Sequence, residues 1–435
     1  MKRTKRAKTE PISKGRRAKR LSLFIVIPLI LVSLFVIAAT TYKIVEIVIT
    51  NNPPTDFPKL EISLAEVPIE EIDANSKNIK YPGNTVTLTV DDKTTTFENV
   101  EIKGRGNSTW LKIKKPYQIK FNEKVSLFDY TPAKKWILLA NSFDSTYLKT
   151  DTAFKIVDIL SNDSALGGKF IELNIDESYR GLYYLTEKLE IGKSHIKLTN
   201  PLGVLMELDN LYKDNNECYY DKAGDCLIVK DIVNEDQKDA SMEDVIANFN
   251  ALKSAIKSKN YHEIKKIIDI DSFARYFLLS EFIINPDAYS TSLFIYKDGP
   301  EDKIHIGPGW DFDLAFKQSF DKPKESRKEF TEHNSAFSVI FDLIEIPEFM
   351  TRVKEIYQET LSGKGDELLD YVRSQAEYIR PAALRDQERW KLKTNFDDEV
   401  EYLIDWIAKR YNYFEENYGV NSNPAPESPQ PSQEL

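Results

Sequence analysis

Three aspartates that lie close together in the chain have the residue type and spacing to do chemistry. Asp287 follows an Asn-Pro pair, and Asp311 and Asp313 lie in a Trp-Asp-Phe-Asp run about two dozen residues later. The apolar run 293–296 and a turn separate them, which predicts a hairpin that returns Asp311 to Asp287. Gathered carboxylates repel one another unless a cation or proton lies between them, and Mg2+ prefers such oxygen ligands. The pattern therefore predicts a magnesium site, although it also fits a turn aspartate and a strand end.

A second group of candidate residues lies upstream. The backbone N–H groups of the turn 104–109, Gly-Arg-Gly-Asn-Ser-Thr, can surround phosphate oxygens, and Lys115 or Lys120 can pair with phosphates. Taken singly, such turns are more often plain connections, and strand lysines more often face solvent. A glycine-containing turn, a strand lysine and metal-binding aspartates, in this order, are typical of phosphoryl transfer, which depends on positioning and charge neutralisation.

The elements that must position these residues change in type along the chain. Alternating or continuous apolar runs predict strands at 85–90, 94–102, 117–121, 136–140, 170–175 and 181–187. Apolar stripes predict helices at 145–161, after a capping box at Ser241, after an N-cap at Asp271, and at 338–345, 347–362, 365–379 and 396–418. Strands followed by helices predict an α+β fold.

The N-terminus has the pattern of an uncleaved signal anchor. Residues 1–20 contain ten basic residues and one acid, and an apolar stretch without charge follows from Leu21 to Tyr42, within a predicted anchor at 21–43. About 20 apolar residues span a bilayer, and basic residues remain on the cytoplasmic side. We therefore expect a basic cytoplasmic arm, a single transmembrane helix and an extracytoplasmic main domain at the cell membrane.

The remaining chain divides into four predicted parts. A linker at 44–57 precedes a strand-rich lobe at 58–240 and a helical lobe at 241–420, and the Pro-rich tail 421–435 is expected to be disordered. The whole chain carries a net charge of −10 although its first twenty residues are basic, which argues against nucleic acid as a partner. Cys218 and Cys226 flank a turn and can form a cross-strand disulfide in an oxidising exterior.

Several of these motifs, in this order, resemble the CotH family of atypical protein kinases, named after spore coat protein H. The residues that carry the resemblance are Lys103–Trp110, Lys114–Phe121, Lys135–Asn141, Asp144, Gly181–Lys188, Glu207–Asp209, Asn285–Asp287 and Trp310–Phe316. The resemblance implies a reduced protein-kinase-like bilobal fold, with a strand-rich nucleotide-binding lobe and a helix-rich catalytic lobe.

The resemblance also implies roles for the aspartates. Asp287 resembles the catalytic base, and Asp311, with Asp313 beside it, resembles the metal-binding Asp-Phe-Gly loop of protein kinases. Protein kinases place a second metal ligand, an asparagine, five residues after the base, where this chain has Ser292. The resemblance therefore implies Mg2+ as a cofactor but puts a second metal ion in doubt.

ATP is the other cofactor that the resemblance implies. Its binding residues would be Arg105 in the glycine-containing turn, a phosphate-pairing lysine, and Glu187 as an acid near the nucleotide. Lys115 and Lys120 both remain candidates for the lysine.

The function expected from these observations is that of a membrane-anchored kinase that transfers the γ-phosphate of ATP to Ser or Thr of surface or envelope proteins. A non-catalytic surface scaffold or adhesion domain with the same architecture is the main alternative, since an extracytoplasmic kinase meets little ATP. A glycosidase with paired carboxylates is a third possibility, but no other motif supports it.

Overall fold

The computed structural model describes residues 57–161, 166–192, 196–209, 217–222, 224–289, 291–316 and 338–420. All of them belong to one compact unit, Thr55–Leu435. The predicted cytoplasmic arm, transmembrane segment and tail, and all of the predicted linker except its last residue, lie outside the described residues. Within the described ranges, none of the helices combines the length and the apolar character needed to cross a bilayer.

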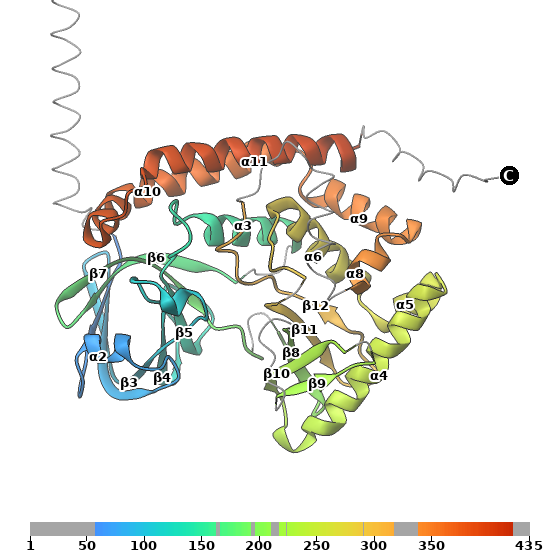
Figure 1. Cartoon of the computed structure of the whole chain (residues 1–435), viewed down its shortest axis with the longest axis horizontal. Coiled ribbons are helices and arrows are strands. Elements are labelled where there is room, and N and C mark those ends of the chain that lie inside the picture. Colours follow the sequence, from blue (N-terminus) through green and yellow to red (C-terminus); the bar gives the residue numbers. More distant parts are fainter. Residues whose placement is uncertain are drawn as a thin grey trace, which may run out of the picture. The chain divides into compact units, whose positions relative to one another are not determined.

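The first half of the described chain forms a closed seven-stranded barrel (Figure 1). Its strands, in hydrogen-bonded order, are β1 (Lys59–Ser63), β2 (Tyr81–Val90), β3 (Lys93–Gly104), β4 (Tyr117–Val125), β5 (Ala133–Leu139), β7 (Ser178–Glu187) and β6 (Gly168–Ile175). The helix α2 (Ile69–Ala74) and the 3-10 turn η1 (Thr109–Leu111) lie in the connections. The strands predicted from alternation are therefore confirmed.

Alternation along each strand separates the barrel core from an outer face. Tyr117, Ile119 and Phe121 of β4 are buried, and Ile119 is paired with Ile102 of β3 and Trp136 of β5. Successive side chains of a strand point to opposite faces. The side chains between these core positions therefore project away from the barrel interior.

A second sheet has five strands in the order β12-β11-β8-β10-β9. They are β8 (Gly203–Leu208), β9 (Cys218–Tyr220), β10 (Cys226–Ile232), β11 (Leu293–Asp298) and β12 (His305–Ile306). Pairing of β8 with β11 joins segments from both sides of the lobe boundary expected at residue 240, and that boundary stays a prediction. Cys218 and Cys226, whose pairing the sequence left open, form a disulfide between β9 and β10.

Helices make up most of the rest of the described chain, so the fold is α+β as predicted. They are α3 (Lys149–Ser161), α4 (Lys238–Lys257), α5 (Tyr261–Ile267), α6 (Ile270–Ile283), α8 (Ser338–Leu343), α9 (Pro347–Thr360), α10 (Gly365–Trp390) and α11 (Phe396–Tyr418), with the 3-10 turn η2 (Glu235–Gln237) before α4. The helix α10 continues to Trp390 with Pro381 inside it, beyond the end predicted at residue 379. One apolar core lies inside the barrel and a second, larger one lies among the helices and the second sheet.

Two predicted helix starts are wrong. Asp269, not Asp271, caps α6, because its carboxylate accepts from the N–H of Ser272 at 2.8 Å. Ser241 lies inside the first turn of α4, which begins at Lys238, and its hydroxyl donates to the carbonyl of Gln237 at 2.9 Å. In both cases the chain enters the helix earlier than the capping pattern suggested.

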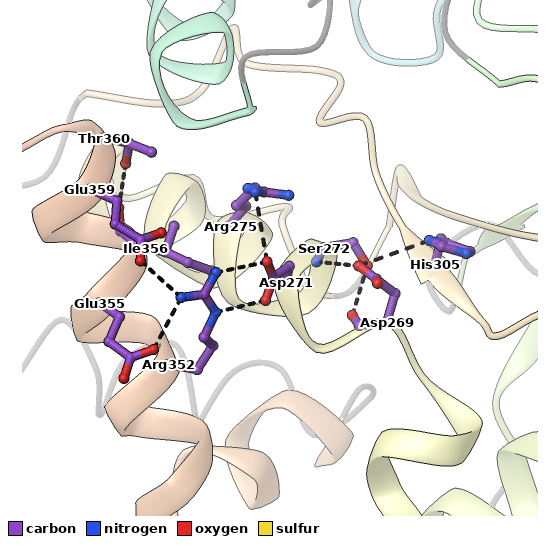
Figure 2. Close-up of polar contacts among 10 residues, drawn as sticks. All are labelled: Asp269, Asp271, Ser272, Arg275, His305, Arg352, Glu355, Ile356, Glu359 and Thr360. Carbon is purple, nitrogen blue, oxygen red and sulfur yellow. Dashed lines mark hydrogen bonds and ion pairs between the residues drawn. The ribbon is translucent and has the colours of Figure 1, made fainter.

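Asp271 joins two helices instead of capping one. Figure 2 shows its carboxylate between the two arms of Arg352 from α9, with the Nε–Oδ1 and Nη2–Oδ2 distances at 2.8 and 2.9 Å. The other contacts of Arg352 are with Glu355 and Glu359 on its own helix. A bidentate pair of this kind fixes geometry as well as charge. It holds the N-terminal turn of α6 against α9.

Arg410 of α11 holds the opposite end of α6. Its side chain is 1% exposed, and its Nε donates to the carbonyls of Glu281 and Phe282 at 3.1 and 3.3 Å. The last four carbonyls of a helix have no partner within the helix. The helix then ends at Ile284, which takes a left-handed conformation, and Asn285 and Asp287 follow directly.

A buried carboxylate joins α10 to the barrel. Asp386 is fully buried, and it accepts hydrogen bonds from the N–H of Leu182 in β7 and from the hydroxyl of Tyr147, both at 2.8 Å. Lys114, in the loop between the glycine-containing turn and β4, pairs with it at 2.7 Å. Burial lowers the pKa of Lys114, and the charge of Asp386 opposes that lowering. The pair fixes the loop that follows the turn 104–109.

We predict that Arg410→Met destabilises the protein by about 2–4 kcal/mol, because two buried carbonyls of α6 lose their donor. Urea unfolding followed by tryptophan fluorescence measures this change. The matched control is Arg373→Met, because Arg373 is exposed on α10 and pairs only with Asp370 three residues away. Its effect should stay below about 0.5 kcal/mol. Equal unfolding midpoints for the two variants would contradict the role assigned to Arg410.

Candidate active site

A cleft of about 740 Å3 lies between the outer face of the barrel and the second sheet. The barrel contributes residues of β3, β4 and β5, the turn 104–109 and residues after β7. The opposite wall consists of β8, β10, β11 and the two loops that contain Asp287 and Asp311. Cavities of this size hold cofactors and other small molecules.

Asn285 positions both aspartate loops. Its side chain is buried, its Oδ1 accepts from the N–H of Asp287 at 3.3 Å, and its Nδ2 donates to the carbonyl of Asp311 at 3.1 Å. The predicted hairpin is confirmed, since β11 and β12 pair antiparallel through Ile295 and Ile306. The hairpin and the amide together place Asp287 and Asp311 in one cleft, where Asp313 also lies.

The loop around Asp311 is locally strained. Asp311 and Ser292 both have positive φ, at 65° and 53°, a region that non-glycine residues seldom occupy. The hydroxyl of Ser292 donates to Oδ2 of Asp311 at 3.1 Å. Such conformations persist where surrounding contacts enforce them, and they concentrate at functional sites. Ser292 therefore belongs to the site, as a direct contact of Asp311.

The aspartates affect one another through their charges. The half-buried Asp287 has a pKa raised to about 6, first by burial and then by the negative charges of Asp311 and Asp209. Within the described ranges, no lysine or arginine forms an ion pair with Asp287 or Asp311. This wall of the cleft therefore attracts a cation.

Two further acids belong to this wall, and the sequence reasoning gave them no role in the site. Glu207 and Asp209 lie at the end of β8 and line the cleft. Burial raises the pKa of Glu207, while Lys230, 2.6 Å away, opposes that rise. Asp209 accepts from the hydroxyl of Thr291 at 3.1 Å. The motif 207–209 carried the family resemblance, and this was the signal available in the sequence.

The barrel wall is cationic. Lys103 of β3, Arg105 of the turn and Lys188 after β7 all line the cleft. Burial lowers the pKa of Lys103, and the charge of Lys188 adds to the lowering. The Arg105 guanidinium lies 5.7 Å from the ring centroid of Trp310. Burial lowers its pKa, whereas Asp311, Asp313 and Glu207 oppose that change. Arg105 is thus electrostatically coupled to the acidic wall.

The path of the turn 104–109 depends on Gly106 and on contacts with Lys77. Gly106 has a φ of +77°, and a Cβ there would lie 2.0 Å from the Thr109 hydroxyl oxygen. Lys77 donates to the Gly106 carbonyl at 2.6 Å and also contacts the side chain of Asn107. The glycine is required for this path, because other residues meet both a steric clash and backbone strain.

Three predicted nucleotide-binding residues are not among those that line the cleft. Lys115 donates to the carbonyl of Trp110 at 2.6 Å and lies over its ring. Lys120 lies two residues beyond the cleft-lining Gln118 on β4, paired with Glu101 and Lys135. Glu187 is buried at the end of β7. The structure therefore brings Asp287, Arg105, Asp311 and Asp313 together, and does not bring Lys115, Lys120 or Glu187 to them.

The acids present fit a magnesium ion that arrives with a nucleotide. In the part of the chain that the structure describes, no three His, Cys, Asp or Glu side chains form a ready-made metal site. Mg2+ usually binds one or two protein carboxylates and takes its other ligands from phosphates and water. Asp311 with Asp313 or Asp209 offers such a set, and the cationic wall faces it.

Comparison with known proteins agrees with the resemblance seen in the sequence. The family model described as "CotH kinase protein" matches residues 102–414. The chain therefore belongs to the CotH kinase protein family. One relative is the inner spore coat protein H of Bacillus subtilis (strain 168), which is 21% identical over 262 residues, covering 58% of this chain and 66% of the relative. This chain thus spans slightly less than two thirds of that relative's length.

We predict that Asp209→Asn lowers the pKa of Asp287 from about 6 toward the ordinary aspartate value, because a nearby negative charge is removed. Carbon NMR of the Asp287 carboxyl group, in metal-free protein, measures the pKa directly. The sign has a consequence for stability. Between about pH 4 and 6 the folded state keeps a proton that the unfolded chain loses, so Asp287 lowers stability as pH rises. The Asp209→Asn variant should lose less stability between about pH 4 and 6. An unchanged pKa of Asp287 would contradict the electrostatic effect of Asp209 on it.

Proposed function

We propose that this protein is a kinase that binds Mg-ATP in the cleft and transfers the γ-phosphoryl group to a serine or threonine hydroxyl of a protein. The proposal rests on one observation: the cleft has an acidic wall and, opposite it, a cationic wall. Asp209, Asp287 and Asp311 line one wall, and Lys103, Arg105 and Lys188 line the other. A triphosphate with a bound divalent cation fits these two walls, because its phosphates would face the cationic wall and its metal ion would face the carboxylates.

The two-wall arrangement also supports a protein-kinase-like bilobal organisation. The strand β3, the glycine-containing turn and β4 form part of the barrel wall of the cleft, and the helix α3 follows β5. The hairpin of β11 and β12 carries Asp287 and Asp311 on the other side. A strand–turn–strand over a carboxylate hairpin is the arrangement that kinases use to hold phosphates over a metal site.

In the proposed reaction, Asp287 accepts the proton of the attacking hydroxyl. The hydroxyl oxygen forms a bond to the γ-phosphorus while the bond from that phosphorus to the β,γ-bridging oxygen breaks, and ADP leaves with the electron pair. A pKa of about 6 leaves most of Asp287 ionised at neutral pH, as a general base requires. Bound Mg2+ supplies neutralisation of the phosphate charge. Arg105, Lys103 and Lys188 would hold the phosphates from the barrel side.

The place of action and the acceptor are part of the proposal. The apolar stretch 21–43 behind a basic arm supports a single membrane anchor with the kinase domain outside the cytoplasm. The disulfide between Cys218 and Cys226 is consistent with an oxidising compartment. Surface or envelope proteins are then the acceptors within reach of the tethered domain.

One observation favours a second candidate, a non-catalytic scaffold with the kinase architecture. Ser292 occupies the position at which protein kinases have a metal-binding asparagine, and its hydroxyl is already hydrogen-bonded to Asp311. A hydroxyl engaged in this way is a weaker metal ligand than an amide carbonyl. Nucleotide binding that requires Mg2+ would favour the kinase, and its absence at millimolar ATP would favour the scaffold.

We predict that Asp287→Asn lowers phosphorylation of the protein itself, or of a surface-protein acceptor, by about 100-fold or more, because the general base is lost. Incorporation of labelled phosphate from Mg-ATP measures this. Asn is nearly isosteric, so folding and nucleotide binding should persist. The matched control is Asp370→Asn, an exposed carboxylate on α10 paired with Arg373, which should leave the rate unchanged. Equal labelling by wild type and Asp287→Asn would remove Asp287 as the base.

A further inference from the structure

Gln118 presents its amide to the cleft. The residue is 8% exposed, and it lines the cleft from β4. Among the residues that the structure describes, its amide has no hydrogen-bond partner, and its nitrogen and oxygen are not among the solvent-inaccessible polar atoms, so they face the open cleft. Asn141, a comparably buried amide in the same cleft, differs because it donates to the carbonyl of Tyr147 at 3.2 Å. Gln118 is therefore a nine-tenths buried polar side chain whose hydrogen-bonding capacity is available to a ligand.

The sheet register places this amide among cations. In the barrel, Gln118 is paired with Lys103 on one side and with Ile137 on the other. Residues directly opposite each other on neighbouring strands project to the same face, so all three point into the cleft. Lys188 lines the same wall and is close enough to lower the pKa of Lys103 in addition to the effect of burial.

The amide is available to a ligand in the cleft. Its polar atoms remain accessible there, so in the free protein they can bind water, which a ligand can displace. The cationic surroundings define the ligand as an anion, and the N–H groups of Gln118 can donate to it.

We propose that Gln118 is a phosphate-binding residue, whose amide N–H donates to a non-bridging oxygen of the nucleotide phosphates beside Lys103. The inference rests on the proposed function, because the phosphates are those of the bound nucleotide. Lys103 supplies charge, and Gln118 supplies a directed, neutral donor that limits where the phosphate lies. Neither Lys115 nor Lys120 can replace this pair in the cleft, because neither lines it.

Gln118→Leu in the full-length chain tests the proposal. Leucine has a similar size and removes both polar groups. We expect Mg-ATP affinity, measured by titration calorimetry, to fall about tenfold, while the urea midpoint stays the same because the amide has no partner in the protein to lose. If Gln118 had a purely structural role, Gln118→Leu would instead lower the urea midpoint and leave Mg-ATP affinity unchanged.

Gln387→Leu is the matched control. Gln387 in α10 is also 8% exposed, but it does not line the cleft, and its amide donates to the hydroxyl of Thr394 at 3.4 Å. Removing this partnered amide should lower the urea midpoint and leave Mg-ATP affinity unchanged. Gln118→Glu supplies a second, nearly isosteric variant. Its carboxylate would repel the phosphates, so its affinity should fall below that of Gln118→Leu.

The choice of ligand separates phosphate binding from contact with the nucleoside. ATP and ADP should both lose affinity for Gln118→Leu, whereas adenosine should bind both proteins equally. Equal loss for adenosine would overturn the phosphate assignment. Wild-type affinity for Mg-ATP in Gln118→Leu would overturn this inference and leave the proposed function standing. Failure of the wild-type protein to bind Mg-ATP would overturn the proposed function, and the inference with it.

Discussion

The candidate active site depends on holding together carboxylates that repel one another, and the buried amide of Asn285 is the contact that does so. It bonds to the backbone of both aspartate loops, at Asp287 and at Asp311. The amide is itself held at the end of α6, a helix fastened by Arg352 near its start and by Arg410 near its end. The repulsion is thus balanced by the packing of three helices rather than by a cation from the chain.

The same electrostatic problem explains the asymmetry of the cleft. Acids gather where the second sheet and its loops meet the cleft, and cations gather on the outer face of the barrel. Neither wall neutralises the other through direct ion pairs to Asp287 or Asp311 among the described residues. A ligand that carries both signs, such as a metal-bound triphosphate, therefore interacts favourably with both walls. Trp310, packed beneath Arg105, lies where the walls approach each other.

Local patterns predicted the parts of the site that lie close together in sequence. The hairpin that returns Asp311 to Asp287 followed from an apolar run and a turn, and the strand predicted at 117–121 is β4. The roles of Asp209, Lys103 and Gln118 were missed, because barrel register and sheet order decide which strand ends face the cleft. Lys115 illustrates the limit, since its charge suggested a ligand contact, whereas its side chain lies over Trp110. Charge and spacing do not reveal which neighbour a long side chain reaches.

The contacts of Asp386 in α10 with the barrel affect the order in which parts of the fold can form during synthesis. Asp386 bonds to Leu182 and Tyr147, which precede it by 204 and 239 residues, and it neutralises the buried Lys114. A chain made from its N-terminus exposes the barrel strands long before this carboxylate emerges. Until then Lys114 has no counter-charge, and the loop behind the glycine-containing turn is held only by contacts with earlier residues such as those from the hydroxyls of Ser142 and Tyr183. The barrel side of the cleft is therefore completed late in biosynthesis, so that a partial chain released early would carry every cleft-lining residue yet lack the buried ion pair behind the turn.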